Sequence, residues 1–318
     1  MKKNILKISV IIVMLFSVTG CTKYMKDEDK NVIKNPSTGQ QLPSNILCKP
    51  EDKETLSIYE DYNKTTKNEK VDLENLSTCE SMPIKSKNYE GLWVTIFVQP
   101  LAWLIIKIGN LLNSYGLGLI LCTLLIRGIC YPFTRKTAMQ SEKLKEAQPK
   151  LTKLEKKYEN KTDQDSMMRK SQEMMMIYKE YDINPMSGCL FSFIQIPLFF
   201  AFYEAISRIP AIFEETFLGF QLGTSPYVAL FSQGKFIYII LIVLVIAATY
   251  FSFKLNSGAS MSKEQEEQMK MMTNMMIIFM AITAFTISSG IAIYWITSNV
   301  FTIIQNLLVK RGGKHARD

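Results

Sequence analysis

The chain has 318 residues, of which 47% are hydrophobic, and a formal net charge of +8. A polar part ends near residue 90 and a strongly apolar part follows, which indicates a membrane protein with an appended polar segment. The charge alone would suit a nucleic-acid binder, but most Lys and Arg lie beside apolar runs, where they orient spans and attract anionic lipid headgroups. The six cysteines show no C-x-x-C spacing and the only histidine is His315, so the sequence predicts no metal site, no cofactor and no enzyme.

Residues 1–20 form a predicted signal peptide. Three lysines come before a short apolar segment, Ile8 to Phe16, which ends near Val18-Thr19-Gly20-Cys21. The last four residues resemble a bacterial lipoprotein box, with cleavage before Cys21 and a lipid such as palmitate on that cysteine. The alternative is an ordinary signal peptide, or a first anchor, in which Cys21 occurs by chance.

Residues 21–88 are rich in charged and small polar residues and are interrupted by four prolines. Such a composition buries little apolar surface, so we predict an extracellular, mostly flexible segment. In an oxidising exterior Cys48 and Cys79 could form a disulfide, and two free thiols are the alternative.

The apolar part contains one ambiguous run and five clear spans. The ambiguous run lies in residues 89–113 and includes Pro100 and Lys107, so it could cross the membrane or lie in its outer interface with Trp93 and Trp103 as anchors. An exterior N-terminus followed by a basic segment after residue 134 requires one crossing between them, which favours an interfacial amphipathic helix. The five predicted spans lie at about 117–133, 186–206, 236–253, 271–288 and 291–309.

Charge supports this orientation independently. The loop 207–234 contains Arg208 as its only cation and would be exterior, whereas 254–270 and the basic tail 312–318 would be cytoplasmic. Each loop then obeys the positive-inside rule. The sequence therefore predicts a multi-pass plasma-membrane protein with a lipid-anchored exterior N-terminus and a cytoplasmic C-terminus.

Residues 134–182 would form a cytoplasmic helical hairpin. Apolar residues recur at helical spacing on both sides of the turn-like stretch 160–165, and the charges alternate in sign as on a solvated face. We expect Pro132 and Pro185 to mark the two ends of this hairpin.

Arg127 stands out because it lies inside the first predicted span. A charged side chain at membrane depth costs about 2.5 to 3.5 kcal/mol and usually marks function. Arg135 marks the cytoplasmic boundary, so Arg127 lies about 12 Å inside it, farther than an arginine side chain reaches by snorkelling. A hydrated pocket around Arg127 is therefore the favoured interpretation.

Several residue strings resemble the YidC family of membrane protein insertases, in particular its Gram-positive lipoprotein type. They occur in order between about residues 90 and 311, and residues 22–88 lie outside the resemblance. The strings are Ile126-Arg127-Gly128, Tyr131-Pro132, Gln148-Pro149-Lys150, Glu173-Met174-Met175, Tyr178, Asn184-Pro185, Gly188-Cys189, Gln195-Ile196-Pro197, Ser289-Gly290, Tyr294-Trp295, Ser298-Asn299 and Ile303-Ile304-Gln305.

The resemblance implies an all-α integral membrane protein with an insertase core, 114–311, in which five transmembrane helices surround a hydrophilic groove. Nascent membrane proteins would enter this groove from the cytoplasm and leave sideways into lipid. The implied groove residues are Arg127, Thr123, Gln195, Tyr294, Trp295, Asn299, Thr302 and Gln305. The implied partners are nascent membrane proteins, the ribosome, membrane lipids and, in some systems, the Sec translocon.

Two other classes of function were weighed. A small-solute transporter or channel could line its path with the same polar residues, although the sequence has no internal repeat and one prominent intramembrane cation. A lipid-anchored structural or sensory protein is supported only by the exterior segment. The basic tail could touch ribosomal RNA, but anchoring to the inner leaflet is favoured.

Overall fold

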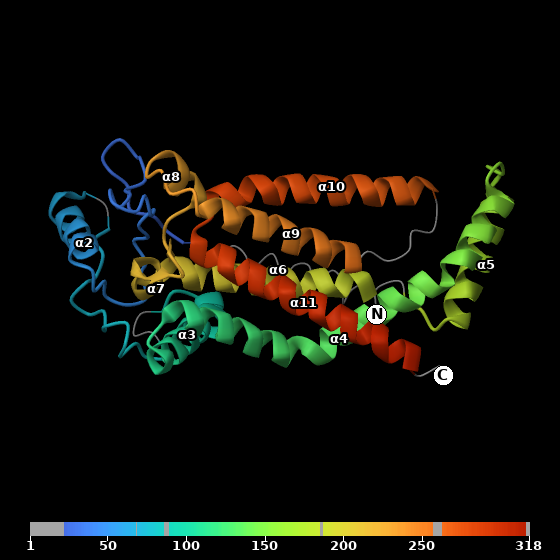
Figure 1. Cartoon of the computed structure of the whole chain (residues 1–318), viewed down its shortest axis with the longest axis horizontal. Coiled ribbons are helices and arrows are strands. Elements are labelled where there is room, and N and C mark those ends of the chain that lie inside the picture. Colours follow the sequence, from blue (N-terminus) through green and yellow to red (C-terminus); the bar gives the residue numbers. More distant parts are fainter. Residues whose placement is uncertain (1–21, 68, 86–88, 185–186, 257–262, 316–318) are drawn as a thin grey trace. The chain divides into compact units, whose positions relative to one another are not determined.

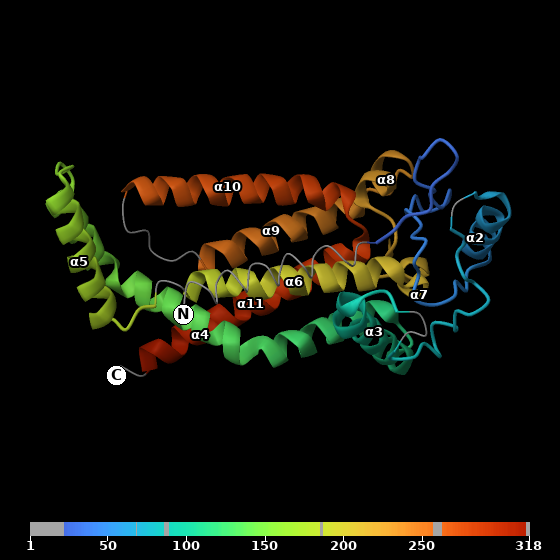
Figure 2. The ribbon, with the colours of Figure 1, turned by 180° about the vertical axis from the view of Figure 1, so that it is seen from behind.

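The computed structural model describes residues 22–67, 69–85, 89–184, 187–256 and 263–315, and these residues are mostly helical (Figures 1 and 2). The predicted signal peptide and Cys21 lie outside the described residues. The elements in chain order are α2 (Lys53–Thr65), η1 (Val94–Val98), α3 (Gln99–Leu112), α4 (Tyr115–Tyr158), α5 (Gln164–Glu180), α6 (Ser187–Arg208), α7 (Pro210–Glu214), β1 (Thr216–Phe217), β2 (Phe220–Gln221), α8 (Pro226–Phe231), α9 (Tyr238–Asn256), α10 (Lys263–Thr286) and α11 (Ser289–His315).

Four helices of the described part are long and apolar enough to cross a membrane. They are Val94–Leu112, Tyr115–Tyr158, Tyr238–Leu255 and Ser289–Lys310, and Thr273–Thr286 is a shorter apolar helix. The all-α membrane fold agrees with the sequence analysis. By length and composition the helix Val94–Leu112 is able to cross, so its predicted place in the outer interface stays a prediction, as does the count of five spans.

The chain divides into two compact units, which are described separately. The first unit consists of Met1–Leu125, Gln195–Leu244 and Thr283–Thr297, and the second of Ile126–Ile194, Val245–Ile282 and Ser298–Asp318. Long helices such as α4 and α11 contribute their first part to the first unit and the remainder to the second.

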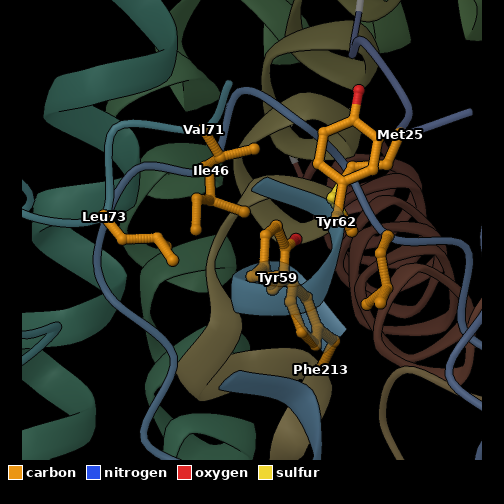
Figure 3. Close-up of a cluster of buried hydrophobic side chains, with 8 residues drawn as sticks. Met25, Ile46, Tyr59, Tyr62, Val71, Leu73 and Phe213 are labelled. Atoms are coloured by element: carbon orange, nitrogen blue, oxygen red, sulfur yellow. The ribbon is translucent and has the colours of Figure 1, made fainter. Parts of the chain in front are cut away.

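In the first unit the N-terminal segment, residues 22–85, packs into a small core. With Phe213 of α7, seven of its residues form one cluster of buried hydrophobic side chains: Met25, Leu42, Ile46, Tyr59, Tyr62, Val71 and Leu73. Figure 3 shows this cluster, and Tyr59 and Tyr62 are among the side chains that it labels. The helix α2 begins at an N-cap, Asp52, whose carboxylate accepts a hydrogen bond from the Thr55 amide at 2.8 Å. The prediction of a mostly flexible segment is therefore wrong for these residues, because their large apolar side chains pack with Phe213 of α7.

A disulfide joins Cys48 to Cys79, with the two Cα atoms 4.8 Å apart. It closes a loop with a sequence separation of 31 residues. By the chain-entropy argument such a closure stabilises the folded state by about 3 to 4 kcal/mol. Of the two alternatives for this cysteine pair, the structure contains the disulfide.

The helix α4 starts in the first unit at a negatively charged cap. The carboxylate of Glu215 accepts hydrogen bonds from the Ser114 hydroxyl at 2.7 Å and from the Tyr115 amide at 2.5 Å. An anion at this end favours the helix dipole. Nearby, α3 and α4 approach so closely that a Cβ on Gly118 would lie 2.7 Å from the backbone of Gly109, which only glycine permits.

In the second unit α4 continues without a break to Tyr158, although it contains Pro132 and Pro149. The expectation that Pro132 ends the cytoplasmic hairpin is therefore wrong. A proline removes one backbone hydrogen bond, a loss that membrane helices tolerate. Pro185, expected at the other end, lies outside the described residues.

The end of α4 and the whole of α5 form the predicted helical hairpin. Ala147, Leu151 and Tyr178 are buried between them. The ion pair Lys143–Asp182, at 2.7 Å, joins an early residue to a late one, and Lys157–Glu173, also at 2.7 Å, lies nearer the turn, so the helices are antiparallel. Exposed pairs of this kind contribute about 0 to 1 kcal/mol each, and the buried apolar residues hold the hairpin together.

Candidate functional site

Arg127, on α4, is only 4% exposed. Its guanidinium donates a hydrogen bond to the hydroxyl of Ser298, a buried residue of α11 in the same unit. Seven residues farther along both helices, the Thr134 hydroxyl donates to the side-chain oxygen of Gln305 at 2.9 Å. The second unit therefore brings α4 and α11 together through two polar contacts, one of them made by an ionised side chain.

The spacing of these contacts determines the relative direction of the two helices. Both pairs have the same sequence separation, 171 residues, so residue numbers rise together along α4 and α11 and the helices are parallel. Seven residues are about two turns, which keeps both contacts on one face of each helix. Two parallel spans require an odd number of crossings between them, and α6, α9 and α10 would provide three.

Polar and apolar residues are distributed on α11 in the opposite way to a soluble helix. Its buried face in the second unit carries Ser298, Thr302, Gln305 and Asn306, and its exposed face carries Val300, Ile304, Leu307 and Leu308. The second unit's part of α4 repeats the pattern, with Arg127 and Thr134 buried and Ile129 and Phe133 exposed. Apolar side chains outside and hydrogen-bonded polar side chains inside suit a helix that faces lipid on one side and a polar interior on the other.

The position of Arg127 along α4 makes its charge unusual. The helix is continuous from Arg127 to the exposed Arg135, so eight residues separate them by about 12 Å along the axis. A guanidinium stays ionised at every physiological pH, and its burial is expensive unless hydrogen bonds or charge compensate. The Ser298 hydroxyl, a neutral hydrogen-bond acceptor on α11, is one of its partners.

The other predicted groove residues are divided between the two units. Asn299, Thr302 and Gln305 are in the second unit with Arg127, and the Thr302 hydroxyl donates to the Ser298 carbonyl at 3.0 Å. Asn299 is partly buried. The Thr302 contact turns its hydroxyl back onto its own helix. Gln305, in contrast, has a side-chain contact to α4.

Tyr294, Trp295, Gln195 and Thr123 belong to the first unit. Tyr294 is fully buried and stacks on Phe202 of α6 with ring centroids 4.3 Å apart. Trp295 meets Phe199 edge to face at 5.3 Å. These contacts pack α11 against α6, and Tyr294 is placed in an aromatic core.

Thr123 is fully buried one turn before Arg127 on α4. Its hydroxyl donates to the Leu119 carbonyl at 2.7 Å, within the same helix. Gln195 is partly buried near the start of the first unit's share of α6. Their roles in a groove stay predictions.

Two features escaped the sequence analysis. Ser298 and Thr134 were not selected as site residues, although their spacing of seven from Gln305 and from Arg127 was a usable signal. The second feature is a buried ion network in the first unit, around Arg208. Its guanidinium pairs with Glu90 at 2.6 Å and lies 3.8 Å from Glu204, which accepts a hydrogen bond from the Trp93 indole at 2.9 Å.

The residues described by the structure contain no group of three or more His, Cys, Asp or Glu side chains that could hold a metal ion.

Comparisons with known proteins place this geometry in context. The family model described as 60Kd inner membrane protein matches residues 107–316. The membrane protein insertase YidC of Oceanobacillus iheyensis is 35% identical over 243 residues, which cover 74% of this chain and 91% of that protein. The membrane protein insertase YidC 2 of Bacillus anthracis is 37% identical over 232 residues, covering 72% and 85%. The membrane protein insertase MisCA of Bacillus subtilis is 34% identical over 238 residues, covering 74% and 86%.

A solved structure, described as an active YidC insertase crystal structure with the first transmembrane domain resolved, is similar with a TM-score of 0.50. It is 22% identical in sequence, and the match covers 67% of this chain and 46% of that one. At this identity the likeness concerns the fold.

Proposed function

This chain belongs to the YidC family of membrane protein insertases, and we propose that Arg127 and the polar face of α11 receive the polar tail of a nascent membrane protein. Family membership makes it a multi-pass membrane protein and an insertase, which is not an enzyme. It also favours insertion over the alternative of a small-solute transporter or channel.

One observation supports the proposed site above the others: between Arg127 and Thr134 on α4, and between Ser298 and Leu308 on α11, polar side chains are buried and large apolar side chains are exposed. The exposed apolar faces are suited to contact with lipid and with the hydrophobic span of a substrate. The buried polar faces are suited to a hydrophilic tail that has to pass through the hydrocarbon region.

Arg127 would act by charge. A carboxylate at about 5 Å from the guanidinium, with an effective dielectric constant near 20, gains roughly 3 kcal/mol. This gain is comparable to the cost of placing one charged side chain partway into a membrane. An acidic tail would be drawn toward Arg127, and the substrate's hydrophobic span would then partition sideways into lipid. The energy would come from that partitioning and from the membrane potential.

The finer parts of the proposal concern partners and orientation. We propose that nascent chains arrive from the ribosome at the hairpin formed by α4 and α5, with or without the Sec translocon. The parallel directions of α4 and α11 support an odd number of crossings between them, as five spans require. With an exterior N-terminus, lipid-anchored at Cys21, the basic tail would be cytoplasmic and would anchor to the inner leaflet.

The test uses proteoliposomes and a single-span substrate with an acidic N-terminal tail. Arg127→Lys should keep most of the insertion, whereas Arg127→Glu should lower it about tenfold or more, because the attraction becomes repulsion. The matched control is Lys235→Glu, which makes the same charge change at an exposed lysine before α9. Equal activity of Arg127→Lys and Arg127→Glu would contradict the electrostatic mechanism.

A second test concerns the hairpin. Deletion of residues 140–180 should leave a protein that still inserts into membranes, because the apolar helices remain, but that no longer inserts substrates. Crosslinking of ribosome-bound nascent chains to residue 123 or 295 would measure substrate capture directly. Full insertion activity of the deletion protein would exclude a role for the hairpin.

A further inference from the structure

The first unit contains a cavity of about 380 Å³ that lies outside the proposed groove. Its described lining comes from three places: the N-terminal segment, the end of α6 with the following loop and α8, and the turn between α10 and α11. Cavities of this size commonly hold small ligands. The site is therefore large enough for a polar group of several heavy atoms.

The lining has a specific chemical character. Among the described residues it contains one charged side chain, Lys34, and no carboxylate. The other polar groups are neutral, chiefly hydroxyls and amides, such as those of Tyr203, Ser207, Ser288 and Gln41. Within the described part of the chain Lys34 makes no ion pair. One unpaired cation among neutral donors suits a ligand with a single negative charge and several hydroxyl groups.

The cavity also lies at the ends of membrane helices. Thr286 is the last residue of α10, and Ile291 lies in the first turn of α11. Tyr227 lines the cavity from α8, is exposed, and pairs with the exposed Phe231 with ring centroids 5.2 Å apart. Exposed aromatic side chains at the end of a membrane helix bundle are typical of the headgroup region of a bilayer.

An exposed apolar side chain lies at the same end of α10. Phe285, in the first unit, comes directly before Thr286, which lines the cavity. An acyl chain would contact apolar surface of this kind while its headgroup occupied the cavity.

We propose that this cavity binds the glycerol phosphodiester headgroup of an anionic phospholipid, with Lys34 pairing with the phosphate. A phosphodiester carries one negative charge, which matches the single lysine, and the glycerol hydroxyls match the tyrosine, serine and glutamine side chains. A choline headgroup fits less well, because its cation would lie near Lys34 without a carboxylate partner. The proposal does not depend on the role of Arg127.

Lipid binding here would have a structural consequence. The cavity joins the N-terminal segment to α6, where the hydroxyls of Tyr24 and Tyr203 lie 3.5 Å apart, and to the start of α11. A bound headgroup would fill this space with hydrogen bonds and would hold the N-terminal segment against the ends of the spans.

The experiment uses the purified full chain in neutral detergent. It is titrated with phosphatidylglycerol and with phosphatidylcholine of the same acyl chains, and bound lipids are counted by native mass spectrometry. We expect preferential binding of phosphatidylglycerol, which Lys34→Gln lowers about fivefold, the effect of one basic side chain near anionic lipid. Tyr203→Phe, which removes a hydroxyl from the α6 part of the lining, should lower it about threefold.

The matched control is Lys26→Gln. Lys26 is another exposed lysine of the same segment, it lies outside the cavity lining, and its replacement removes the same charge. An equal loss for Lys26→Gln would mean general attraction to the basic surface and would overturn the proposal. No preference for phosphatidylglycerol, or an unchanged Tyr203→Phe protein, would overturn it as well.

A competition arm distinguishes the two sources of the same chemistry. Soluble glycerophosphoglycerol, the deacylated phosphodiester headgroup, is added at millimolar concentration to the complex with phosphatidylglycerol. If it leaves the lipid bound, the phospholipid is supported as the ligand. If it displaces the lipid through a Lys34-dependent site, the lipid assignment is overturned in favour of the free phosphodiester.

Discussion

Replacing Arg208 with methionine should destabilise the first unit by about 3 to 5 kcal/mol, the cost of removing one partner from a buried ion network. Its guanidinium is fully buried and donates to the Asn45 carbonyl at 2.6 Å, in addition to the pairs with Glu90 and Glu204. Glu204 would keep the Trp93 indole as a partner but lose its nearby positive charge. Glu90 is partly exposed and would regain contact with water.

Chemical denaturation of the purified protein, followed by tryptophan fluorescence, measures this loss, because Trp93 is part of the network. The control is Arg169→Met. Arg169 lies at the same 3.8 Å from a carboxylate four residues earlier, Asp165, but its side chain is 70% exposed, against 0% for Arg208. The control should cost less than about 1 kcal/mol.

A second variant tests the reason for the effect. Adding Glu204→Gln to Arg208→Met removes the buried charge that has lost its partner, and should restore about 2 kcal/mol of the free energy of unfolding. If Arg208→Met costs no more than Arg169→Met, or if the double variant is no more stable than Arg208→Met alone, burial does not determine the energetics of this network.

Three further predictions concern stability, each measured by chemical denaturation. Glu215→Gln should lower the free energy of unfolding by about 1 to 2 kcal/mol, because the negative charge at the start of α4 is lost. An unchanged free energy of unfolding would show that this cap does not stabilise the helix. Reduction of the disulfide, or Cys79→Ser, should lower the free energy of unfolding by about 3 to 4 kcal/mol. The control is Cys122→Ser, which replaces a free cysteine and should respond to reductant as the parent protein does. A parent protein whose stability does not change with reductant would contradict this prediction. Burial raises the pKa of Glu214 above its ordinary value. The folded state therefore holds the carboxyl proton of Glu214 more tightly than the unfolded chain does. This proton's contribution to stability falls as the pH rises from about 4.3 through the folded pKa. Glu214→Gln should remove that part of the pH dependence, and an identical pH profile for both proteins would refute the assignment.

The helical segments of the membrane part were predictable because their signals are local. Apolar runs, flanking charges and helical periodicity identified the first span, the hairpin and α9, and an arginine in an apolar run identified Arg127. Prolines were a weaker signal. Pro132 resembled a helix boundary in the sequence, but α4 continues through it, because the loss of one backbone hydrogen bond does not by itself end a membrane helix.

The N-terminal segment shows where composition misleads. Its average composition is that of a flexible chain, yet Tyr59 and Tyr62 of α2 pack with Phe213, which comes from a distant part of the chain. The same is true of Arg208, which resembled an ordinary loop cation in the sequence and is fully buried among carboxylates in the structure. Burial of these residues depends on partners more than 100 positions away, which local patterns do not contain.

The sequence by itself determined the class of the protein, its family, its helical segments and the unusual charge at Arg127, because each follows from hydrophobicity and residue type along a continuous stretch. The tertiary structure alone decided which polar groups meet. Ser298 and Arg127, like Gln305 and Thr134, are 171 residues apart, and their contacts exist only because α4 and α11 lie parallel in the second unit. Tyr294, predicted to flank the substrate path, stacks on Phe202, and its role in a groove stays a prediction. Tertiary packing decides which distant helices lie side by side. It therefore decides which of the many polar residues are close enough to interact.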